Sequence, residues 1–372
     1  MHRFRPAPAL FAAVALLGCQ SGQDSKAPAP PPAASAPAPA PEAPSPAAPA
    51  PAKAEPPAAE LGYLKPTEDA EHCEWMRQPL PGTATRVFRF EAACDRSQVS
   101  WSADGRQGLI FTWPSGEGEV PRAWRVNADT KAGEPLDLKT LPGGTSAGNE
   151  NEPYVSRLGF DAEGRPVALI FVAFAPKAVQ KNAVTFAGES FPVPPGKGIP
   201  GLAMAFRLED SGWKRIEAKA HRVQESTPSD QGLLDAEATL TPAYTASPPS
   251  QALGTRVPGA TAKALNAQVP GAAEGAWWME LPGPGGTLYY SARRAGPLLA
   301  MGQPLIWQRG AQRVFLKDLA EPDAYLSFQF GRGLLLVTSY GGFAAANVWN
   351  PETQQRVVAI PEAYAPAFWP AP

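Results

Sequence analysis

Histidine, cysteine and charge are scarce in this sequence of 372 residues. It contains 3 His and 3 Cys, 18% of its residues are charged, and its formal net charge is −2. One histidine is His2, so His72 and His221 are the two that follow the amino-terminal segment. Since histidine is the side chain best suited to proton transfer near neutral pH, the chain offers few groups for acid–base catalysis. Its basic residues form no block, so we expect no nucleic-acid partner.

Long apolar runs are also absent. The run at Ala9–Leu17 has nine residues, whereas a membrane-spanning helix needs about 17–25. No later segment reaches that length without charge or proline, so we expect no membrane-spanning helix in the mature chain. A phosphate-binding loop, a metal-ligand spacing and a paired-carboxylate motif are equally missing. We therefore predict no cofactor, no metal and no catalytic residue.

The amino end does carry an informative pattern. Arg3 and Arg5 precede Ala9–Leu17, and Leu16-Leu17-Gly18-Cys19 follows. This arrangement resembles a bacterial lipoprotein signal peptide with its lipobox, in which the signal is removed and the cysteine is lipidated. The resemblance implies cleavage after residue 18, a lipid on Cys19, and anchoring in the bacterial cell envelope. Gln20 after the cysteine favours the outer membrane, while an ordinary signal with an incidental Cys19 is the alternative.

Residues 27–59 have the composition of a linker. They include 13 Pro and 15 Ala among 33 residues, which cannot form a hydrophobic core. Proline-rich linkers adopt extended polyproline II at about 3.1 Å per residue, so this one can reach on the order of 100 Å. We predict a disordered spacer over 19–60 that carries the lipid anchor, followed by a globular domain over 61–372. The alternative is a proline-rich ligand for a partner domain.

Two cysteines remain after Cys19, namely Cys73 and Cys94. An even pair in an exported protein predicts a disulfide. The alternative is a metal pair with His72, but adjacent His72 and Cys73 do not have a useful zinc spacing and a fourth ligand is missing. We therefore expect Cys73 and Cys94 to be joined.

The globular part has the pattern of an all-β protein. Short apolar or alternating runs are separated by Gly, Pro, Asp and Asn, as is typical of strands and turns. Two runs around Pro-Gly-Pro-Gly-Gly predict a hairpin, and short helices are predicted over Leu233–Leu240 and Ala260–Gln268. The predicted strands are Arg86–Phe90, Gly108–Trp113, Val167–Phe174, Ala203–Leu208, Trp277–Leu281, Thr287–Ala292, Arg313–Leu316, Leu334–Ser339 and Arg356–Ile360.

Internal repeats indicate how these strands are organised. An aromatic residue, an acidic-Gly-Arg turn and an apolar strand recur at 101–111 and 160–171, with a gapped copy at 328–337. An Asn-x-x-Thr turn between strands occurs at 127–130 and 350–353. These repeats resemble the blades of TolB-like and WD40-like β-propellers, in which four-stranded sheets stack radially. The resemblance implies a propeller-like domain of about six to seven blades, and a two-sheet β-sandwich is the alternative.

Several motifs have both a chemical and a bland interpretation. Gly144–Gly148 matches the Gly-x-Ser-x-Gly elbow around Ser146, which needs a strand before the serine and a helix after it. Pro142-Gly143 interrupts that approach, and His72 or His221 would have to be the base. The run Asn149–Glu152 lacks the spacing of a calcium loop, so we interpret it as solvated.

The remaining candidates are acidic and aromatic. We interpret the acidic cluster of Glu68, Asp69, Glu71 and Glu74 as a solvated surface. Trp277-Trp278 and Tyr289-Tyr290 lie on the two arms of the predicted hairpin. Adjacent strand residues point to opposite faces, so one residue of each pair is expected in the core, and the other is free to stack on a sugar or peptide.

These observations favour a lipid-anchored envelope protein that binds or scaffolds a protein or glycan partner. An envelope hydrolase or lyase acting on polysaccharide or peptide is the alternative. It would need acidic residues at inner loops, where Asp104 and Glu163 occupy equivalent turns. A third possibility, an assembly factor for outer-membrane proteins, rests on analogy with propeller lipoproteins alone.

Overall fold

The computed structural model describes residues 59–114, 119–146, 152–223, 254–268, 277–294, 298–316, 319, 324–340 and 344–369. The signal, Cys19, residues 19–58 of the spacer and the predicted helix Leu233–Leu240 lie outside these residues, so each stays a prediction. Residues 59 and 60, assigned to the spacer, are instead the start of the first strand. The chain divides into a unit over 1–52 and a unit over 53–372. The described residues all belong to the second unit, in which the strands are paired antiparallel.

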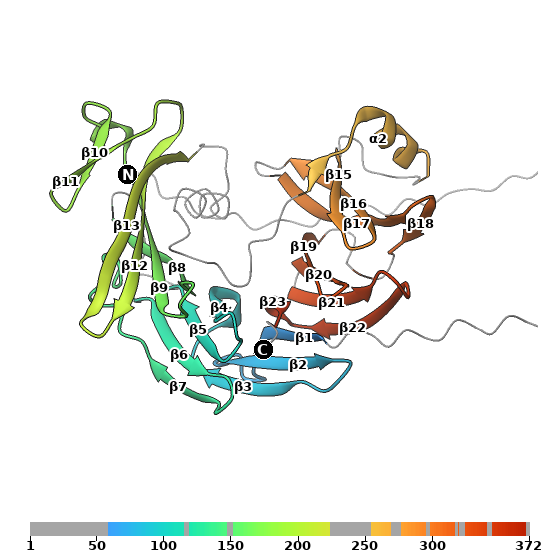
Figure 1. Cartoon of the computed structure of the whole chain (residues 1–372), viewed down its shortest axis with the longest axis horizontal. Coiled ribbons are helices and arrows are strands. Elements are labelled where there is room, and N and C mark those ends of the chain that lie inside the picture. The colour runs from blue at the N-terminus through green and yellow to red at the C-terminus, as the bar shows by residue number, and fades with distance from the viewer. Residues whose placement is uncertain are drawn as a thin grey trace, which may run out of the picture. The chain divides into compact units, whose positions relative to one another are not determined.

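The first sheet joins the two ends of the described chain (Figure 1). β23 pairs with β1, with Leu61 opposite Phe368 and Leu64 opposite Tyr364. The carboxyl-terminal strand therefore completes the sheet that the amino-terminal strand begins. In spatial order, the strands are β23 (Tyr364–Phe368), β1 (Ala59–Pro66), β2 (Cys73–Leu80) and β3 (Thr85–Phe90).

The second and third sheets each follow the order of the chain. A short 3₁₀ turn, η1 (Cys94–Arg96), leads into the second sheet, and η2 (Pro176–Ala178) lies in the long β9–β12 connection of the third. The second sheet holds β4 (Ser97–Trp101), β5 (Gln107–Thr112), β6 (Arg122–Asn127) and β7 (Ala132–Pro135). The third holds β8 (Tyr154–Phe160), β9 (Pro166–Ala173), β12 (Ile199–Glu209) and β13 (Gly212–Val223), with the separate hairpin β10 (Ala183–Phe186) and β11 (Glu189–Pro192) in the β9–β12 connection.

The remaining strands form one hydrogen-bonded set with two parts. The first part is β14 (Thr255–Arg256), β15 (Trp277–Gly283), β16 (Gly286–Arg294), β17 (Leu298–Arg309) and β18 (Gln312–Phe315), with α2 (Gly259–Asn266) between β14 and β15. The second part is β19 (Tyr325–Gly331), β20 (Leu334–Tyr340), β21 (Ala344–Asn350) and β22 (Gln355–Pro361). Residues 300–301 of β17 pair with the start of β19 and link the two parts. The predicted hairpin is confirmed, with Trp277 opposite Ala292.

Successive four-stranded antiparallel sheets, with the last strand completing the first sheet, give the topology of a β-propeller. The chain is therefore all-β and propeller-like, as predicted, and α2 matches the predicted helix at 260–268. The three separate sheets and the two parts of the larger set make five blade-like groups among the described residues. The length of the chain predicted six or seven blades. Because residues 224–253 are not described, the total number of blades stays a prediction.

The repeats are equivalent turns between strands. Gly105 and Gly164 both have positive φ, 70° and 75°, at the β4–β5 and β8–β9 turns, a conformation that glycine adopts without strain. The third copy is the β19–β20 turn, where Gly333 has φ 74°. Asn127 Oδ1 accepts the N–H of Thr130, and Asn350 Oδ1 accepts that of Thr353. The acidic and amide side chains of the repeats thus shape turns.

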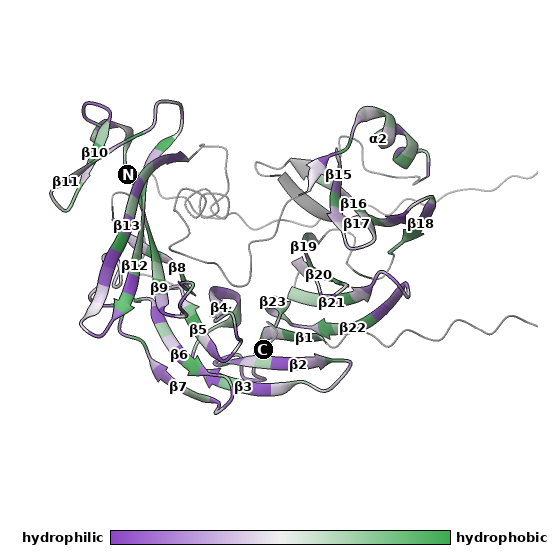
Figure 2. Cartoon of the chain, in the orientation of Figure 1, coloured by the Kyte–Doolittle hydropathy of each residue, from purple (hydrophilic) through white to green (hydrophobic). Residues whose placement is uncertain are grey.

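The cores lie between neighbouring sheets. Hydropathy alternates along strands such as β13 (Figure 2), so one side chain in two can face a neighbour. Between the first and second sheets, the Trp369 ring lies 5.0 Å from Trp75 and 5.3 Å from Trp101, centroid to centroid. Aliphatic residues such as Leu61 and Leu336 fill the space between the first sheet and β20–β22.

Candidate functional site

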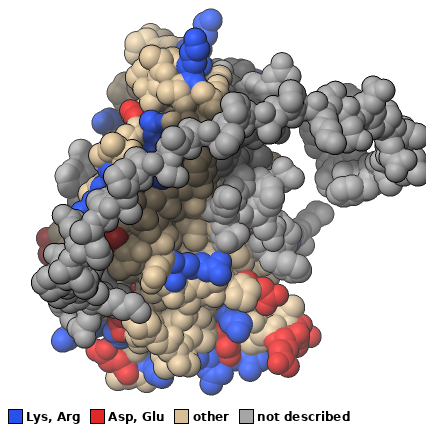
Figure 3. Space-filling view, turned by 90° about the vertical axis from the view of Figure 1, so that its right-hand side faces the viewer, with Lys and Arg blue, Asp and Glu red and all other residues tan. Residues whose placement is uncertain are grey.

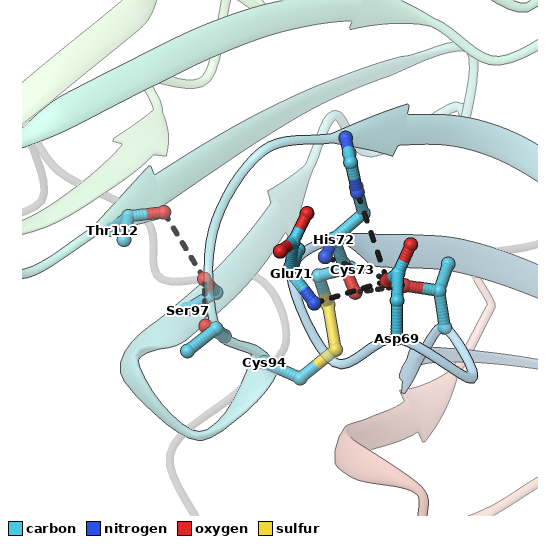
Figure 4. The surroundings of a disulfide bond; sticks show 9 residues. Asp69, Glu71, His72, Cys73, Cys94, Ser97 and Thr112 are labelled. Carbon is cyan, nitrogen blue, oxygen red and sulfur yellow. Dashed lines mark hydrogen bonds and ion pairs between the residues drawn. A yellow bond between two sulfur atoms is a disulfide. The ribbon is translucent and has the colours of Figure 1, made fainter.

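The disulfide between Cys73 and Cys94 is confirmed. The two Cα atoms are 5.3 Å apart and 21 residues separate the cysteines. Cys73 begins β2 and Cys94 begins η1, so the bond ties the first sheet to the entry of the second (Figure 4). Both cysteines are buried. The Cys73 sulfur is therefore committed and cannot be the metal ligand of the alternative interpretation.

The acidic loop before Cys73 brings three potential ligand groups together. Donor atoms of Asp69, Glu71 and His72 lie within 4.8 Å of one another. Asp69 Oδ1 accepts the Thr67 hydroxyl and, at 3.0 Å, the backbone N–H of Glu71. These two bonds, the hydroxyl first, lower the pKa of the Asp69 carboxyl. They account for the shape of this exposed loop, which agrees with the interpretation as a solvated surface.

The Ser146 segment does not form a nucleophile elbow in its described part. Residues 136–146 are turns and irregular backbone, with no strand leading into the serine, and 147–151 are not described. The Ser146 hydroxyl donates to Glu152 Oε2 at 3.1 Å. Glu152 is also the one described residue of the Asn149–Glu152 run. The described residues therefore support neither a nucleophilic Ser146 nor a calcium loop at Asn149–Glu152.

His221, the second candidate base, belongs to the third sheet's packing. It is 3% exposed and lies on β13 opposite Gly201 of β12. Its ring centroid is 5.3 Å from that of Phe171 on β9. An added Cβ at Gly201 would lie about 3.0 Å from the imidazole, so glycine makes room for the histidine ring. This is the position of a core side chain.

The aromatic residues of the β15–β16 hairpin are mostly structural. Trp278, Tyr289 and Tyr290 are buried. The Trp278 indole N–H donates to Asn266 Oδ1 at 2.7 Å, which fixes α2 on the sheet. Trp277 is half-buried, and the Arg256 guanidinium lies 4.6 Å from its ring centroid. The expectation of one core residue in each pair holds for the tryptophans, whereas both tyrosines are buried.

Exposed aromatic surface occurs elsewhere. Among the described residues, the exposed large apolar or aromatic side chains are Val120, Phe315, Tyr325 and Tyr340. Tyr325 begins β19 and Tyr340 ends β20, and the two are directly opposite in the register. They are 48% and 40% exposed. Sequence reasoning missed this pair.

The tyrosine pair lies at the exposed end of a sheet face on which side-chain exposure increases along β20. On the same face of β20, side chains run from Leu334 and Leu336, at 0% and 1% exposure, through Thr338 to Tyr340. On β19, Ser327 lies opposite Thr338, and Gln329 Oε1 accepts the backbone N–H of Phe368. This face therefore contacts the first sheet at its apolar end and opens at the tyrosines. We call Tyr325, Ser327, Thr338 and Tyr340 the hydroxyl wedge.

Connections from two sheets meet near the same end of the strands. The backbone N–H of Ala363 donates to Ala344 O, at the start of the strand that follows Tyr340. Burial raises the pKa of the neighbouring Tyr364 phenol, and the negative charges of Asp95 and Glu362 raise it further. Asp95 is beside the disulfide at Cys94. The wedge and the disulfide region therefore lie at one end of the first sheet and of β19–β22.

Charge on the molecule is mixed. On the face in Figure 3, the described acidic and basic side chains lie side by side near the lower edge. Elsewhere in the described chain, opposite charges are also paired, as in Arg86 with Glu74 and Arg215 with Glu189. Such mixed surfaces do not create the positive field that nucleic acid binding uses.

Known proteins give limited guidance. No protein-family model matches the chain, and no curated protein matches its sequence. Among solved structures, it is similar to TolB from Acinetobacter baumannii, at 11% identity and a TM-score of 0.32, over 84% of this chain and 66% of that one. It is also similar to the β-propeller domain of the Trilobed protease from Pyrococcus furiosus, at 11% identity and a TM-score of 0.24, over 82% and 85%. An endo-arabinase from Bacteroides thetaiotaomicron matches at 11% identity and a TM-score of 0.25, over 81% and 92%.

Proposed function

We propose that this protein is lipid-anchored in the bacterial cell envelope through Cys19 and that its propeller-like head binds a protein or glycan partner. The observation that carries the proposal is the order of its parts: a lipobox, a Pro/Ala-rich segment of 33 residues, and an all-β head. A lipid with a long spacer keeps the head near the membrane while allowing it to reach away. This arrangement suits recognition of something large and local. Gln20 places the anchor in the outer membrane.

The structure of the described head is compatible with this role. None of its helices is both long and apolar enough to span a bilayer. The acidic turn residues that the hydrolase alternative needs are engaged locally. Asp104 Oδ1 accepts the Ser102 hydroxyl and the Arg106 N–H, and Glu163 Oε2 accepts a bond from Arg165 at 2.6 Å. These contacts favour binding over hydrolysis.

The anchor is tested by fractionating cells that express the full chain or its Cys19→Ser variant. We expect the wild-type protein in the membrane fraction with incorporated radiolabelled palmitate, and the variant in the soluble fraction without it. Two acyl chains or more anchor stably, so the difference should be nearly complete. Membrane retention of Cys19→Ser would contradict the anchor.

The binding role is tested with the full-length protein, first in cells and then after purification. Crosslinking in intact cells followed by mass spectrometry should recover one envelope component in stoichiometric amounts. The matched test incubates the same protein with cell-wall polysaccharide and peptide fractions and monitors product release. Turnover of either fraction, together with no recovered component, would establish the hydrolase alternative in place of binding.

A further inference from the structure

Two exposed tyrosines lie side by side at the rim of the hydroxyl wedge. Directly opposite residues on antiparallel strands have Cβ atoms about 4.5–5.5 Å apart, so the Tyr325 and Tyr340 rings can form one continuous platform. The pair is 48% and 40% exposed, whereas most other aromatic side chains of the described chain are buried or half-buried. An exposed aromatic platform suits a ligand that has a flat apolar face.

Two hydroxyl groups without partners lie directly behind the platform. Thr338 is 0% exposed, and its cross-strand neighbour is Ser327. Within the described part of the chain, neither Thr338 Oγ1 nor Ser327 Oγ has a hydrogen-bond partner. Because a buried polar group without a partner costs free energy, a ligand that reaches these hydroxyls would recover part of that cost.

The tyrosine platform and the two hydroxyl groups together indicate the chemical class of the ligand. The four described side chains of the wedge are neutral, so they offer no ionic contact to a charged ligand. An apolar peptide side chain would cover the tyrosines and leave both hydroxyls without partners. A pyranose ring has a C–H face that packs on an aromatic ring and hydroxyl groups at its edge that donate and accept hydrogen bonds. A sugar therefore satisfies both parts of the wedge.

We propose that the hydroxyl wedge is a carbohydrate-binding subsite for a chain of pyranose units, with Tyr325 and Tyr340 as the stacking platform and Thr338 and Ser327 as hydrogen-bonding groups. This inference rests on the proposed binding function and specifies its glycan branch. A pyranose ring stacks on the two tyrosine rings, and hydroxyl groups at its edge pair with Thr338 Oγ1 and Ser327 Oγ. The residues involved come from β19 and β20 alone.

The test measures binding of two soluble probes to the purified full-length protein. The probes are a tetrasaccharide of β-1,4-linked N-acetylglucosamine and cellotetraose, which present flat pyranose faces with different substituents. Saturation-transfer NMR and calorimetry should detect binding of at least one probe. Tyr325→Ala and Tyr340→Ala should each weaken it by roughly tenfold, as expected for loss of an aromatic contact. Tyr340→Phe should bind within about twofold of the wild type, because the ring remains.

A second pair of variants separates binding from folding. Thr338→Val and Ser327→Ala remove hydroxyls that have no partner among the described residues, so both should raise the melting temperature or leave it unchanged. Both should weaken sugar binding. Phe315→Ala is the matched control, since Phe315 is 41% exposed on β18 outside the wedge, and it should bind like the wild type.

Several outcomes would overturn the subsite. No binding of either probe by the wild-type protein at millimolar concentration would exclude it, as would equal loss in Phe315→Ala and Tyr325→Ala. Tyrosine-dependent binding of a synthetic peptide covering residues 27–58, without sugar binding, would assign the platform to the chain's own spacer. The Cys19→Ser fractionation and the crosslinking test do not involve β19 or β20, so they report on the proposed function separately.

Discussion

The closing strand β23 has two unlike flanks. On one side is the aromatic flank, which we define as Trp75, Trp101, Trp369 and the Cys73–Cys94 disulfide. On the other is the aliphatic flank, defined as Leu61, Phe368, Leu334, Leu336 and Val348. The aromatic flank is filled by stacked rings and covalently closed, whereas the aliphatic flank grades into the hydroxyl wedge. The comparison teaches that one side of the closing strand is closed by stacked rings and a covalent bond, whereas the other ends at exposed tyrosines.

Truncating the centre of the aromatic flank should have the largest effect. Trp75 is 0% exposed and its ring stacks on that of Trp369, with the centroids 5.0 Å apart, and on that of Trp101, with the centroids 6.4 Å apart. Trp75→Ala should lower the free energy of unfolding by about 3–5 kcal/mol, because a buried tryptophan leaves a large cavity. Urea denaturation followed by circular dichroism measures this loss.

Leu336→Ala is the counterpart on the aliphatic flank. Leu336 is 1% exposed, and its truncation should cost about 2–5 kcal/mol. We expect its cost to lie below that of Trp75→Ala, since fewer atoms are removed. A larger loss in Leu336→Ala than in Trp75→Ala would show that the aliphatic flank is the more rigid one.

Removing the disulfide should destabilise the protein about as much as Leu336→Ala does. The loop it closes spans 21 residues of separation, for which loop-closure entropy predicts about 3 kcal/mol of stabilisation. The double variant Cys73→Ala/Cys94→Ala should therefore unfold at lower urea concentration. Adding a reductant should destabilise the wild-type protein by a similar amount and leave the variant unchanged. Insensitivity of the wild type to the reductant would mean that the bond does not form.

The smallest effect appears at alkaline pH and differs between the flanks. Burial raises the pKa of the Tyr63 phenol above 10.0, and burial with the charges of Asp95 and Glu362 raises that of Tyr364. Both tyrosines are neutral in the folded and unfolded chains below pH 10. Above pH 10 the unfolded chain ionises first, so the stability they contribute is lost as pH rises through the folded pKa values.

The effect of salt on stability should differ between Tyr63 and Tyr364. Charge–charge effects near the surface are screened by salt, whereas burial is not. Phenylalanine cannot ionise, so melting temperatures between pH 9 and 11 should fall less steeply in Tyr63→Phe and in Tyr364→Phe than in the wild type. High salt should reduce the contribution of Tyr364 and leave that of Tyr63 unchanged. Equal salt sensitivity of the two variants would mean that the flanks share one environment.

Much of the local structure could be predicted from the sequence, because short-range turn chemistry determines it. The Asn-x-x-Thr turns at 127–130 and 350–353 and the Gly105 and Gly164 turns all form where the repeats indicated. The hairpin around Pro-Gly-Pro-Gly-Gly forms for the same reason. Two strands that contain proline, β1 with Pro66 and β23 with Pro366, were missed. Because β1 and β23 are about 300 residues apart in the sequence, no local sequence pattern could predict that they pair.

The hydroxyl wedge was missed because its residues are separated in the sequence. A signal was nevertheless present in the third repeat. The tight turn places Gly331 opposite Leu334, and counting outwards from it pairs Ser327 with Thr338 and Tyr325 with Tyr340. Their exposure could not be predicted, since it depends on where the first sheet ends against β19 and β20. The disulfide, by contrast, followed from a count of two cysteines.

The position of β1 in the first sheet has a mechanical consequence. β1 is the strand that any tension on the amino-terminal segment would load, and it is hydrogen-bonded to β23 on one side and to β2 on the other. A pull along the strand axis loads these bonds together, in shear, whereas peeling an edge strand would break them one after another. Tension on the amino end is therefore resisted by a strand that is hydrogen-bonded along both of its edges.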